Sequence, residues 1–176
     1  PVREEQLSPL TDAGVPRQGL REPFAGRWPA LKAVLWFPTV GDGAAANVGS
    51  GCVSSERVAL TMGTTSAIRL VTEQTVDHVP DGLWCYRVDR SRSLPGGAMT
   101  EGGNVFAWLR DTLDLPRLSE AESRLAAMEP DAHGLTVLPF LAGERSPGWA
   151  GDARATFHGV TLATTPMDIL RAGMEA

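Results

Sequence analysis

The residue with the clearest chemical potential is Asp42, which stands between Gly41 and Gly43, after an apolar stretch and before a run of small residues. The motif fits the loose dinucleotide-binding fingerprint G-x-G-x-x-G/A. Two features argue against that role. The carboxylate would repel a pyrophosphate by on the order of a few kcal/mol in a partly desolvated site. The acidic ribose ligand expected about 20 residues later is missing from residues 57–65. A dinucleotide oxidoreductase is therefore a rival interpretation that lacks its key residue.

The same position suits a general base. Glycines on both sides let the backbone approach a substrate closely, and the start of a helix beyond them would keep the Asp42 carboxylate ionised. An ionised carboxylate within hydrogen-bond reach of a substrate hydroxyl can take its proton as that oxygen attacks. The alternative is structural, because Asp-Gly pairs often serve only as helix caps or turns. Asp42 is thus a candidate catalytic residue, with Gly41 as a candidate substrate contact beside it.

Two further glycine-containing segments could contact phosphate. Residues 62–66, MGTTS, combine glycine flexibility, three hydroxyls and successive backbone N–H groups, an arrangement that can wrap phosphate oxygens. Residues 96–104, GGAMTEGGN, open an expected helix, and a helix N-terminus binds anions. Each segment also has an ordinary interpretation, the first as a plain hairpin turn and the second as a capping loop.

Composition excludes several other chemistries. The 176-residue chain has a net charge of −5 and scattered basic residues, whereas nucleic-acid binding needs a basic surface. Lys32 is the only lysine and precedes an expected strand, which removes a Walker A loop and a Schiff-base lysine. The histidines and cysteines lack the spacing of a zinc site, so no metal site is expected from the protein's own residues. Cys52 and Cys85 allow one disulfide at most.

The termini and the hydropathy pattern lead to two expectations. No apolar run approaches the ~18 residues of a membrane span, and the N-terminus lacks the layout of a signal peptide, so a cytoplasmic protein without a membrane partner is expected. The chain does not begin with Met and stops inside an expected helix. We therefore interpret it as a piece of a longer protein.

Alternating strand and helix patterns position the candidate residues. Strands are predicted at 33–40, 57–61, 67–72, 83–88 and 135–141, the first and last of them buried. Helices are predicted at 44–52, 104–113, 119–128 and 166–176. Ser119 and Glu122 have the spacing of a capping box at the start of one helix. Residues 90–97 and 143–152 are predicted loops. Glu144 and Arg145 in the second loop are a candidate ion pair, with a role in substrate binding as the alternative. The pattern indicates an α/β architecture.

The order of these motifs resembles the central part of the FGGY carbohydrate kinases, a family that includes gluconokinase, xylulokinase and glycerol kinase. The resemblance is carried by GDGAAANVGSGC, ALTMGTTSAIR, GGAMTEGGNVFAWLRD and LPFLAGERSPGW, in that order. The final stretch is similar to the family's C-terminal signature at Ala155, Phe157, Gly159, Val160, Asp168, Ile169 and Ala172. It departs from that signature at Gly173, where the family usually has a larger residue. The form LAGERSPGW is most similar to gluconokinase-type members.

The resemblance implies a fold and a set of roles. The fold would be α/β and actin-like, with two ribonuclease-H-like domains closing on a cleft. Residues 1–55 would be the tail of the sugar-binding domain and residues 56–176 the first part of the ATP-binding domain. Asp42 would fall on the catalytic base, with Gly41 beside it on the substrate side. The ATP phosphates would meet Gly63, Thr64 and Thr65, and the rest of the nucleotide would meet Gly102, Gly103 and Asn104.

The implied function is ATP-dependent phosphorylation of a hydroxyl on a sugar or sugar acid, most of all a gluconate-like one, with Mg²⁺ bridging the phosphates. The implied partners are that small molecule and ATP. A second copy of the chain, forming a homodimer, is left open as a protein partner. The alternative is a non-catalytic nucleotide-binding or interaction module on the same scaffold; Asp42 with both flanking glycines favours the kinase. Because most sugar contacts and the adenine site would lie outside these residues, the chain alone is expected to be inactive.

Overall fold

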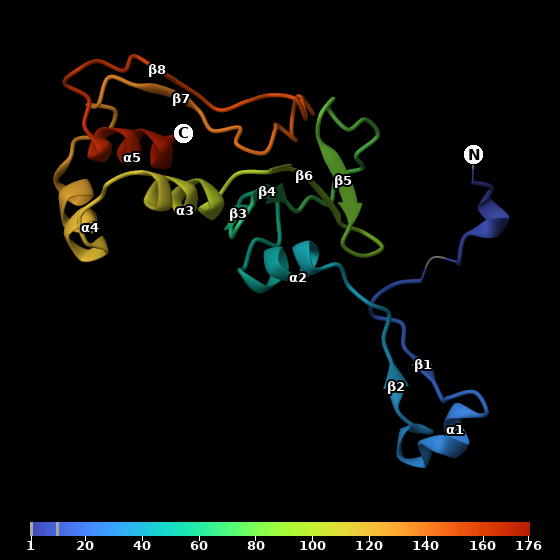
Figure 1. Ribbon diagram of the computed structural model, residues 1–176. Helices are drawn as coiled ribbons and strands as arrows, with labels where there is room; N and C mark the ends of the chain where they lie inside the picture. Colours follow the sequence, from blue (N-terminus) through green and yellow to red (C-terminus); the bar gives the residue numbers. More distant parts are fainter. Residues whose placement is uncertain (1, 10) are drawn as a thin grey trace.

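A computed structural model describes residues 2–9 and 11–176 and shows a main body with an N-terminal arm (Figure 1). At the centre of the body is an antiparallel sheet in the order β3-β4-β6-β5. Its strands are β3 (Val58–Met62), β4 (Ser66–Leu70), β6 (Ser93–Met99) and β5 (Trp84–Arg87). β3 and β4 form a hairpin in which Met62 pairs with Ser66, so residues 63–65 make the turn. The strands expected at 57–61, 67–72 and 83–88 are confirmed.

β6 contradicts the loop predicted over 90–97, because this strand runs between β4 and β5 in the interior of the sheet. Pro95, Gly96 and Gly97 are turn-type residues by propensity. The packing nevertheless requires small residues at this point. A Cβ atom on Gly96 would lie 2.5 Å from the Ile68 carbonyl oxygen and 2.9 Å from the Trp84 ring. Tertiary packing therefore overrides the local signal.

Helix α2 (Asp42–Gly49) packs on this sheet and confirms the helix expected at 44–52, although it begins earlier, at Asp42. Its Ala44 is buried with Val71 and Leu94 in a small apolar core. Asn47 is completely buried, and its side-chain amide donates a hydrogen bond of 3.3 Å to the main-chain carbonyl of Arg69 on β4. The helix that begins with Asp42 is thereby attached to the sheet.

Three more helices form a second core, and all three were expected from the sequence. They are α3 (Gly103–Thr112), α4 (Leu118–Ala127) and α5 (Pro166–Glu175). Their buried residues are Val105, Leu109, Ala121, Leu125, Met167 and Leu170. A Cβ atom on Gly173 would lie 2.5 Å from Leu109 Cδ1, so the glycine at this position lets α5 approach α3 closely.

The helix caps differ from expectation. Arg117 takes the N-cap position of α4 without a side-chain hydrogen bond, so the capping box expected from Ser119 and Glu122 is wrong. A capping box instead begins α5, where the Asp168 carboxylate accepts from the Thr165 N–H at 2.8 Å and the Thr165 hydroxyl accepts from the Asp168 N–H at 3.3 Å. Hydrogen bonds from the Thr165 hydroxyl and backbone lower the pKa of Asp168. The ionised Asp168 carboxylate stabilises α5, because a negative charge interacts favourably with the positive end of the helix dipole.

The strand predicted over 135–141 is shorter and less buried than expected. β7 (Thr136–Leu138) pairs with β8 (Thr156–His158), a strand that the sequence did not predict. In both strands the middle residue is half-buried and its neighbours are exposed. The strand is short because Pro139 follows it and cannot donate to a sheet. Residues 143–152 form turns and irregular backbone, as expected.

The N-terminal arm, residues 11–40, extends away from the body (Figure 1). It contains β1 (Arg17–Gln18), α1 (Phe24–Arg27), η2 (Pro29–Leu31) and β2 (Leu35–Trp36), with η1 (Glu4–Gln6) before it. The buried strand predicted over 33–40 is wrong, because only two of its residues form a strand and both are exposed. β2 pairs only with β1 within the described parts of the chain, so no second layer covers its apolar side chains. None of the described helices is long and apolar enough to cross a membrane.

Candidate active site

Asp42 is the first residue of α2 and lies at an open cavity of about 530 Å³, here called the Asp42 cavity. Gly41 takes the N-cap position, and a Cβ atom there would meet nothing within 4 Å. The Asp42 carboxylate is exposed and accepts a hydrogen bond of 2.7 Å from the N–H of Gly43. Gly41, Asp42 and Gly43 all line the cavity, whose volume lies in the usual range for small-molecule sites. The carboxylate is therefore open to a ligand that approaches across the glycines.

Three arginines line the same cavity: Arg69 from β4, Arg87 from β5 and Arg145 from the loop over 143–152. The Arg69 guanidinium lies 5.7 Å from the centre of the Trp84 ring, and its Nη1 donates to the Thr61 hydroxyl at 3.2 Å. Arg69 ends the segment ALTMGTTSAIR, but sequence reasoning assigned it no role of its own, because its neighbours in the segment do not indicate what an arginine inside a strand contacts. The position of Arg69 near Asp42 depends on the packing of α2 against β4, so it is visible only in the folded structure.

Arg145 corrects the ion pair predicted with Glu144. The Glu144 carboxylate instead accepts from the N–H groups of Gly148 at 2.8 Å and Ala150 at 3.0 Å, which holds the loop in shape. The Arg145 guanidinium lies 5.9 Å from the centre of the Trp149 ring and faces the Asp42 cavity. Arg145, for which a role in substrate binding was the alternative to the ion pair, therefore lines the candidate site.

The turn of the β3–β4 hairpin carries the second predicted motif. Thr65 and Ser66 line the Asp42 cavity together with Asp42 itself. Across the described chain, the backbone N–H and hydroxyl groups of Thr64 and Thr65 donate no hydrogen bond. Both residues are exposed. They are therefore available to phosphate oxygens, which such turns can bind.

The structure brings this turn against the start of α3, where the third predicted motif lies. The N–H of Gly103 donates to the Gly63 carbonyl at 2.8 Å, and the N–H of Asn104 donates to the Thr64 carbonyl at 3.2 Å. A Cβ atom on Gly102 would lie 2.8 Å from the Thr65 backbone. Gly102 and Gly103 also line a smaller cavity of about 180 Å³, here called the Gly102 cavity, with Ser66 shared between it and the Asp42 cavity.

Asn104 has a visible structural role. Its carbonyl oxygen accepts from the N–H groups of Gly102 at 2.7 Å and Val105 at 3.0 Å, and its amide donates to the Thr100 carbonyl at 3.2 Å. The first N–H groups of α3 are therefore already used inside the protein. An anion at this helix terminus would have to displace these internal hydrogen bonds. Gly102 and Gly103 therefore contribute mainly by leaving room for the Gly102 cavity.

Glu101 is a buried polar residue of this region that the sequence analysis did not single out. It is 6% exposed, its carboxylate accepts from the Ala142 N–H at 3.1 Å, and its main-chain carbonyl accepts from the Ser66 hydroxyl at 2.5 Å. Glu101 therefore connects Ser66, directly after the 63–65 turn, to Ala142, directly before the loop over 143–152. Its position directly before Gly102 was the only sequence signal.

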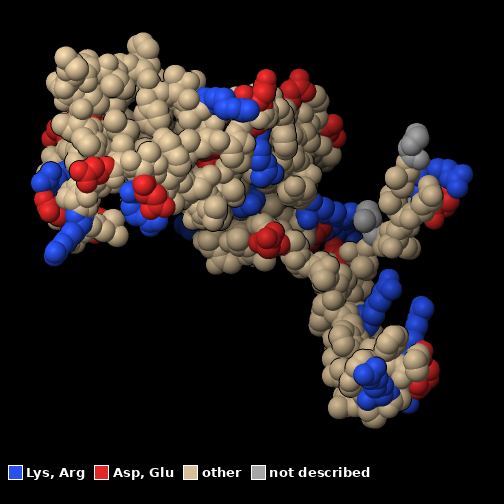
Figure 2. All heavy atoms as spheres, viewed as in Figure 1, with Lys and Arg blue, Asp and Glu red and all other residues tan. Residues whose placement is uncertain are grey.

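Other parts of the described chain offer less chemistry. No group of three His, Cys, Asp or Glu side chains within residues 2–9 and 11–176 could hold a metal ion. Cys52 and Cys85 are free thiols. Figure 2 shows acidic and basic side chains interspersed over the face in view, without a continuous basic stripe.

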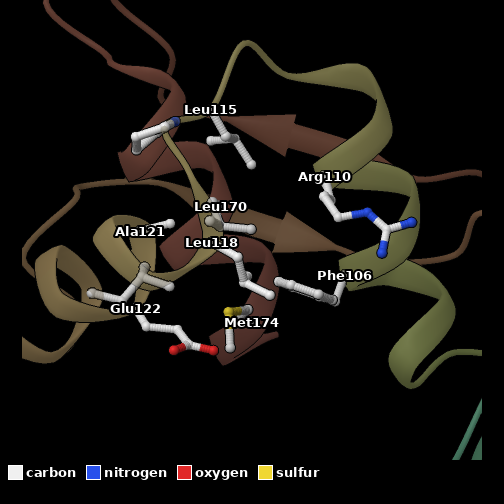
Figure 3. A pocket seen from close by; sticks show the side chains of 10 residues that line it. Phe106, Arg110, Leu115, Leu118, Ala121, Glu122, Leu170 and Met174 are labelled. Atoms are coloured by element: carbon white, nitrogen blue, oxygen red, sulfur yellow. The ribbon is translucent and has the colours of Figure 1, made fainter.

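Figure 3 shows a cavity of about 310 Å³ between α3, α4 and α5. Phe106, Leu115, Leu118, Leu170 and Met174 make most of its wall apolar, and its charged lining residues are Arg110 and Glu122. It lies in the helical part of the body and shares no residue with the Asp42 cavity. Such a wall offers packing rather than a reacting group.

A carboxylate, a hydroxyl-bearing turn and a glycine-rich helix start are thus gathered on one α/β body, around two cavities that share Ser66. The C-terminal domain of the FGGY family of carbohydrate kinases matches residues 58–176, and the chain belongs to this family. The gluconokinase of Bacillus subtilis (strain 168) is 30% identical over 146 residues, covering 76% of this chain and 28% of that protein. The glycerol kinase of Aromatoleum aromaticum (strain DSM 19018 / LMG 30748 / EbN1) is 34% identical over 149 residues, with 77% and 28% covered.

Solved structures agree on the fold. A gluconate kinase from Lactobacillus acidophilus superposes with a TM-score of 0.85 at 26% identity, and a ligand-bound xylulose kinase from the same organism with 0.84 at 26%. Each comparison covers 98% of this chain and 36% of the other. The expected α/β, actin-like fold is thereby confirmed for the part of the fold present. The chain spans 28% of the length of the gluconokinase and glycerol kinase relatives described above.

Proposed function

We propose that this chain forms the central part of an ATP-dependent kinase that phosphorylates a hydroxyl of a sugar or sugar acid, with a gluconate-like acid as the favoured substrate. Residues 1–55 would belong to the sugar-binding domain and residues 56–176 to the ATP-binding domain. The kinase class is supported by the family, and the acid by similarity to gluconokinase. One observation carries the site assignment: Asp42, the turn residue Thr65 and Ser66 at the start of β4 line one cavity.

Asp42 acts in this proposal as the general base. Its exposed carboxylate would take the proton of the acceptor hydroxyl while that oxygen attacks the γ-phosphoryl of ATP in line. The open space above Gly41 gives the acceptor a close approach to the backbone. Catalysis would come mainly from positioning and charge stabilisation, since phosphoryl transfer needs little covalent help from the protein.

The ATP side fits the residues present. Within residues 2–9 and 11–176 the N–H and hydroxyl groups of Thr64 and Thr65 donate no hydrogen bond, and with Gly63 they would contact the phosphates. Gly102 and Gly103 would border the nucleotide where they line the Gly102 cavity, and Asn104 would meet it from the adjoining first turn of α3. The Asp42 cavity contains one carboxylate and no second acidic side chain. Mg²⁺ would therefore be held chiefly through the phosphates, where it neutralises their charge.

The test is a coupled ADP-release assay on the complete kinase that carries this chain, with a panel of sugars and sugar acids as acceptors. Acceptor-dependent ADP release is expected, strongest with aldonic acids. If ATP binds but no acceptor stimulates ADP release, the kinase proposal is wrong. The chain would then be a non-catalytic nucleotide-binding module.

A further inference from the structure

The Asp42 cavity has an excess of positive charge. Three arginines and one acidic residue line it, and none of the three arginines forms a salt bridge within the described residues. An unpaired guanidinium beside a cavity attracts anionic ligands, because field lines concentrate in such a space. The cavity is therefore suited to a negatively charged occupant.

Arg69 is held rigidly in this cavity. Its Nη1 donates to the Thr61 hydroxyl, and its guanidinium lies near the Trp84 ring. Its Nε is buried and has no hydrogen-bond partner among the described residues. This atom packs against Gly43, which has no side chain to displace it. A Cβ atom on Gly43 would lie 3.0 Å from that Nε. The guanidinium is thus fixed beside α2, and no carboxylate among the described residues forms a salt bridge with it.

Arg145 approaches the cavity from the loop over 143–152, whose shape is fixed by the Glu144 carboxylate. Arg145 is exposed, so its guanidinium can meet a ligand without leaving other partners unpaired. Arg87 differs, because its Nε already donates to the Asp89 carbonyl at 2.8 Å. Arg69 and Arg145 are therefore the two arginines best placed to bind an anion.

We infer that Arg69 and Arg145 bind the carboxylate of the acceptor, so that the kinase selects sugar acids over neutral sugars. This inference rests on the proposed kinase function. Arginine matches the planar carboxylate through paired N–H donors. The nucleoside part of ATP is disfavoured because neither arginine lines the Gly102 cavity. The acceptor carboxylate is favoured over the ATP phosphates because Thr64 and Thr65 already offer the phosphates N–H and hydroxyl groups that donate no hydrogen bond within the described chain.

The experiment compares an aldonate with the alditol of the same carbon number, in which the carboxylate is replaced by an alcohol. In the complete wild-type kinase we expect kcat/KM to favour the aldonate by at least ~100-fold, since a site built for a polar group rejects the analogue that lacks it. The Arg69→Gln and Arg145→Gln variants should each lower kcat/KM for the aldonate at least ~30-fold and change that for the alditol less than ~3-fold. Arg117→Gln, at an exposed arginine outside the cavity, is the matched control.

Calorimetric titration with the aldonate alone gives a second readout, and weaker binding is expected in both cavity variants. Arg145→Gln lies on an exposed loop, so it tests the inference even if Arg69→Gln unfolds. Equal loss with aldonate and alditol, together with a raised KM for ATP, would assign the arginines to the transferred phosphoryl group and overturn the inference. Unchanged aldonate kinetics would also overturn it. In both cases acceptor-dependent ADP release persists, so the kinase function stands; its complete absence would remove both proposals.

Discussion

The buried amide of Asn47 donates its hydrogen bond to the main-chain carbonyl of Arg69, at 3.3 Å. This bond joins α2, which begins with Asp42, to the strand that carries Arg69. The candidate base and the candidate anion-binding residue are therefore positioned by one local contact. Disturbing it should affect both groups together.

Replacing Asn47 by alanine should lower the free energy of unfolding by about 2 kcal/mol, because the fully buried amide and its bond to Arg69 are lost. Urea denaturation followed by circular dichroism measures this change. Ala45→Ser, at an exposed position of the same helix, should stay within about 0.5 kcal/mol of wild type. Equal stability of Asn47→Ala and wild type would show that α2 is held by its apolar contacts alone.

Changing Asp42 to asparagine keeps the shape of the side chain and removes its basicity. In the complete kinase, turnover should fall at least ~100-fold while the affinity for ATP changes less than ~3-fold. Steady-state ADP release and nucleotide titration separate the two quantities. Asp77→Asn, at an exposed position outside the cavity, is the control. Unchanged turnover in Asp42→Asn would remove this residue from the mechanism.

Gly102→Ala should separate the 63–65 turn from α3, since the new Cβ atom would lie 2.8 Å from the Thr65 backbone and 3.0 Å from the Gly63 carbonyl oxygen. We expect a loss of about 1–3 kcal/mol in stability and, in the complete kinase, a higher KM for ATP. Gly49→Ala is the matched control, because a Cβ atom there meets nothing within 4 Å and alanine favours the helix. A Gly102→Ala protein with wild-type melting and ATP kinetics would contradict this account.

Stability should fall in acid partly through Asp89. The side-chain hydrogen bond from Arg92, helped by backbone hydrogen bonds from Ser91 and Arg92, lowers the pKa of Asp89 from 3.8 to about 2. A carboxylate whose pKa is depressed by folding stabilises the protein above its unfolded pKa, and this contribution disappears as pH falls through the folded pKa. The loss should therefore occur between about pH 4 and pH 2.

Denaturation at pH 5, 4 and 3 can isolate this effect. Asp89→Asn should be less stable than wild type at pH 5, and the difference should shrink toward pH 3 as the Asp89 carboxyl of the unfolded wild-type chain becomes protonated. A difference that stays constant with pH would mean that the Asp89 charge does not stabilise the turn between β5 and β6.

The 176-residue chain by itself should show no acceptor-dependent ADP release, because it spans 28% of the length of its relatives. The assay is the coupled ADP measurement with an aldonate at millimolar concentration. The complete kinase, at the same molar concentration, serves as the positive control. Acceptor-dependent turnover by the chain alone would show that these residues contain a working site.

The elements with strong periodic or glycine-punctuated patterns were predicted from the sequence. The β3–β4 hairpin and helices α2, α3, α4 and α5 lie close to their expected positions. β6 was not predicted because its Gly96 looks like a turn residue. The glycine is there because any side chain would collide with the Ile68 carbonyl and the Trp84 ring, which are distant in sequence. The strand expected over 33–40 failed for the opposite reason: its apolar residues have no covering layer in the described chain.

The candidate site was predictable only in part. The motifs containing Asp42, Thr65 and Gly102 were found from local sequence, and the structure places all three in or beside adjoining cavities. Their roles stay predictions. Arg145 was singled out from the sequence, but its position beside Asp42 and that of Arg69 could not be predicted, because no spacing rule places a strand residue and a distant loop residue there. Only packing across β4 does so.

Gly96 has a consequence for how freely this sequence can vary. Many exposed positions of the body would tolerate substitution, but any side chain at Gly96 meets the Ile68 carbonyl, the Trp84 ring and the Arg69 backbone, the last at 3.2 Å. In a saturation library of β6, this position should therefore return glycine almost alone. Gly96 pairs with Arg69 across the sheet, so a limit on substitution at Gly96 also keeps β4 in place next to the Asp42 cavity. Gly96 does this without lining the cavity itself.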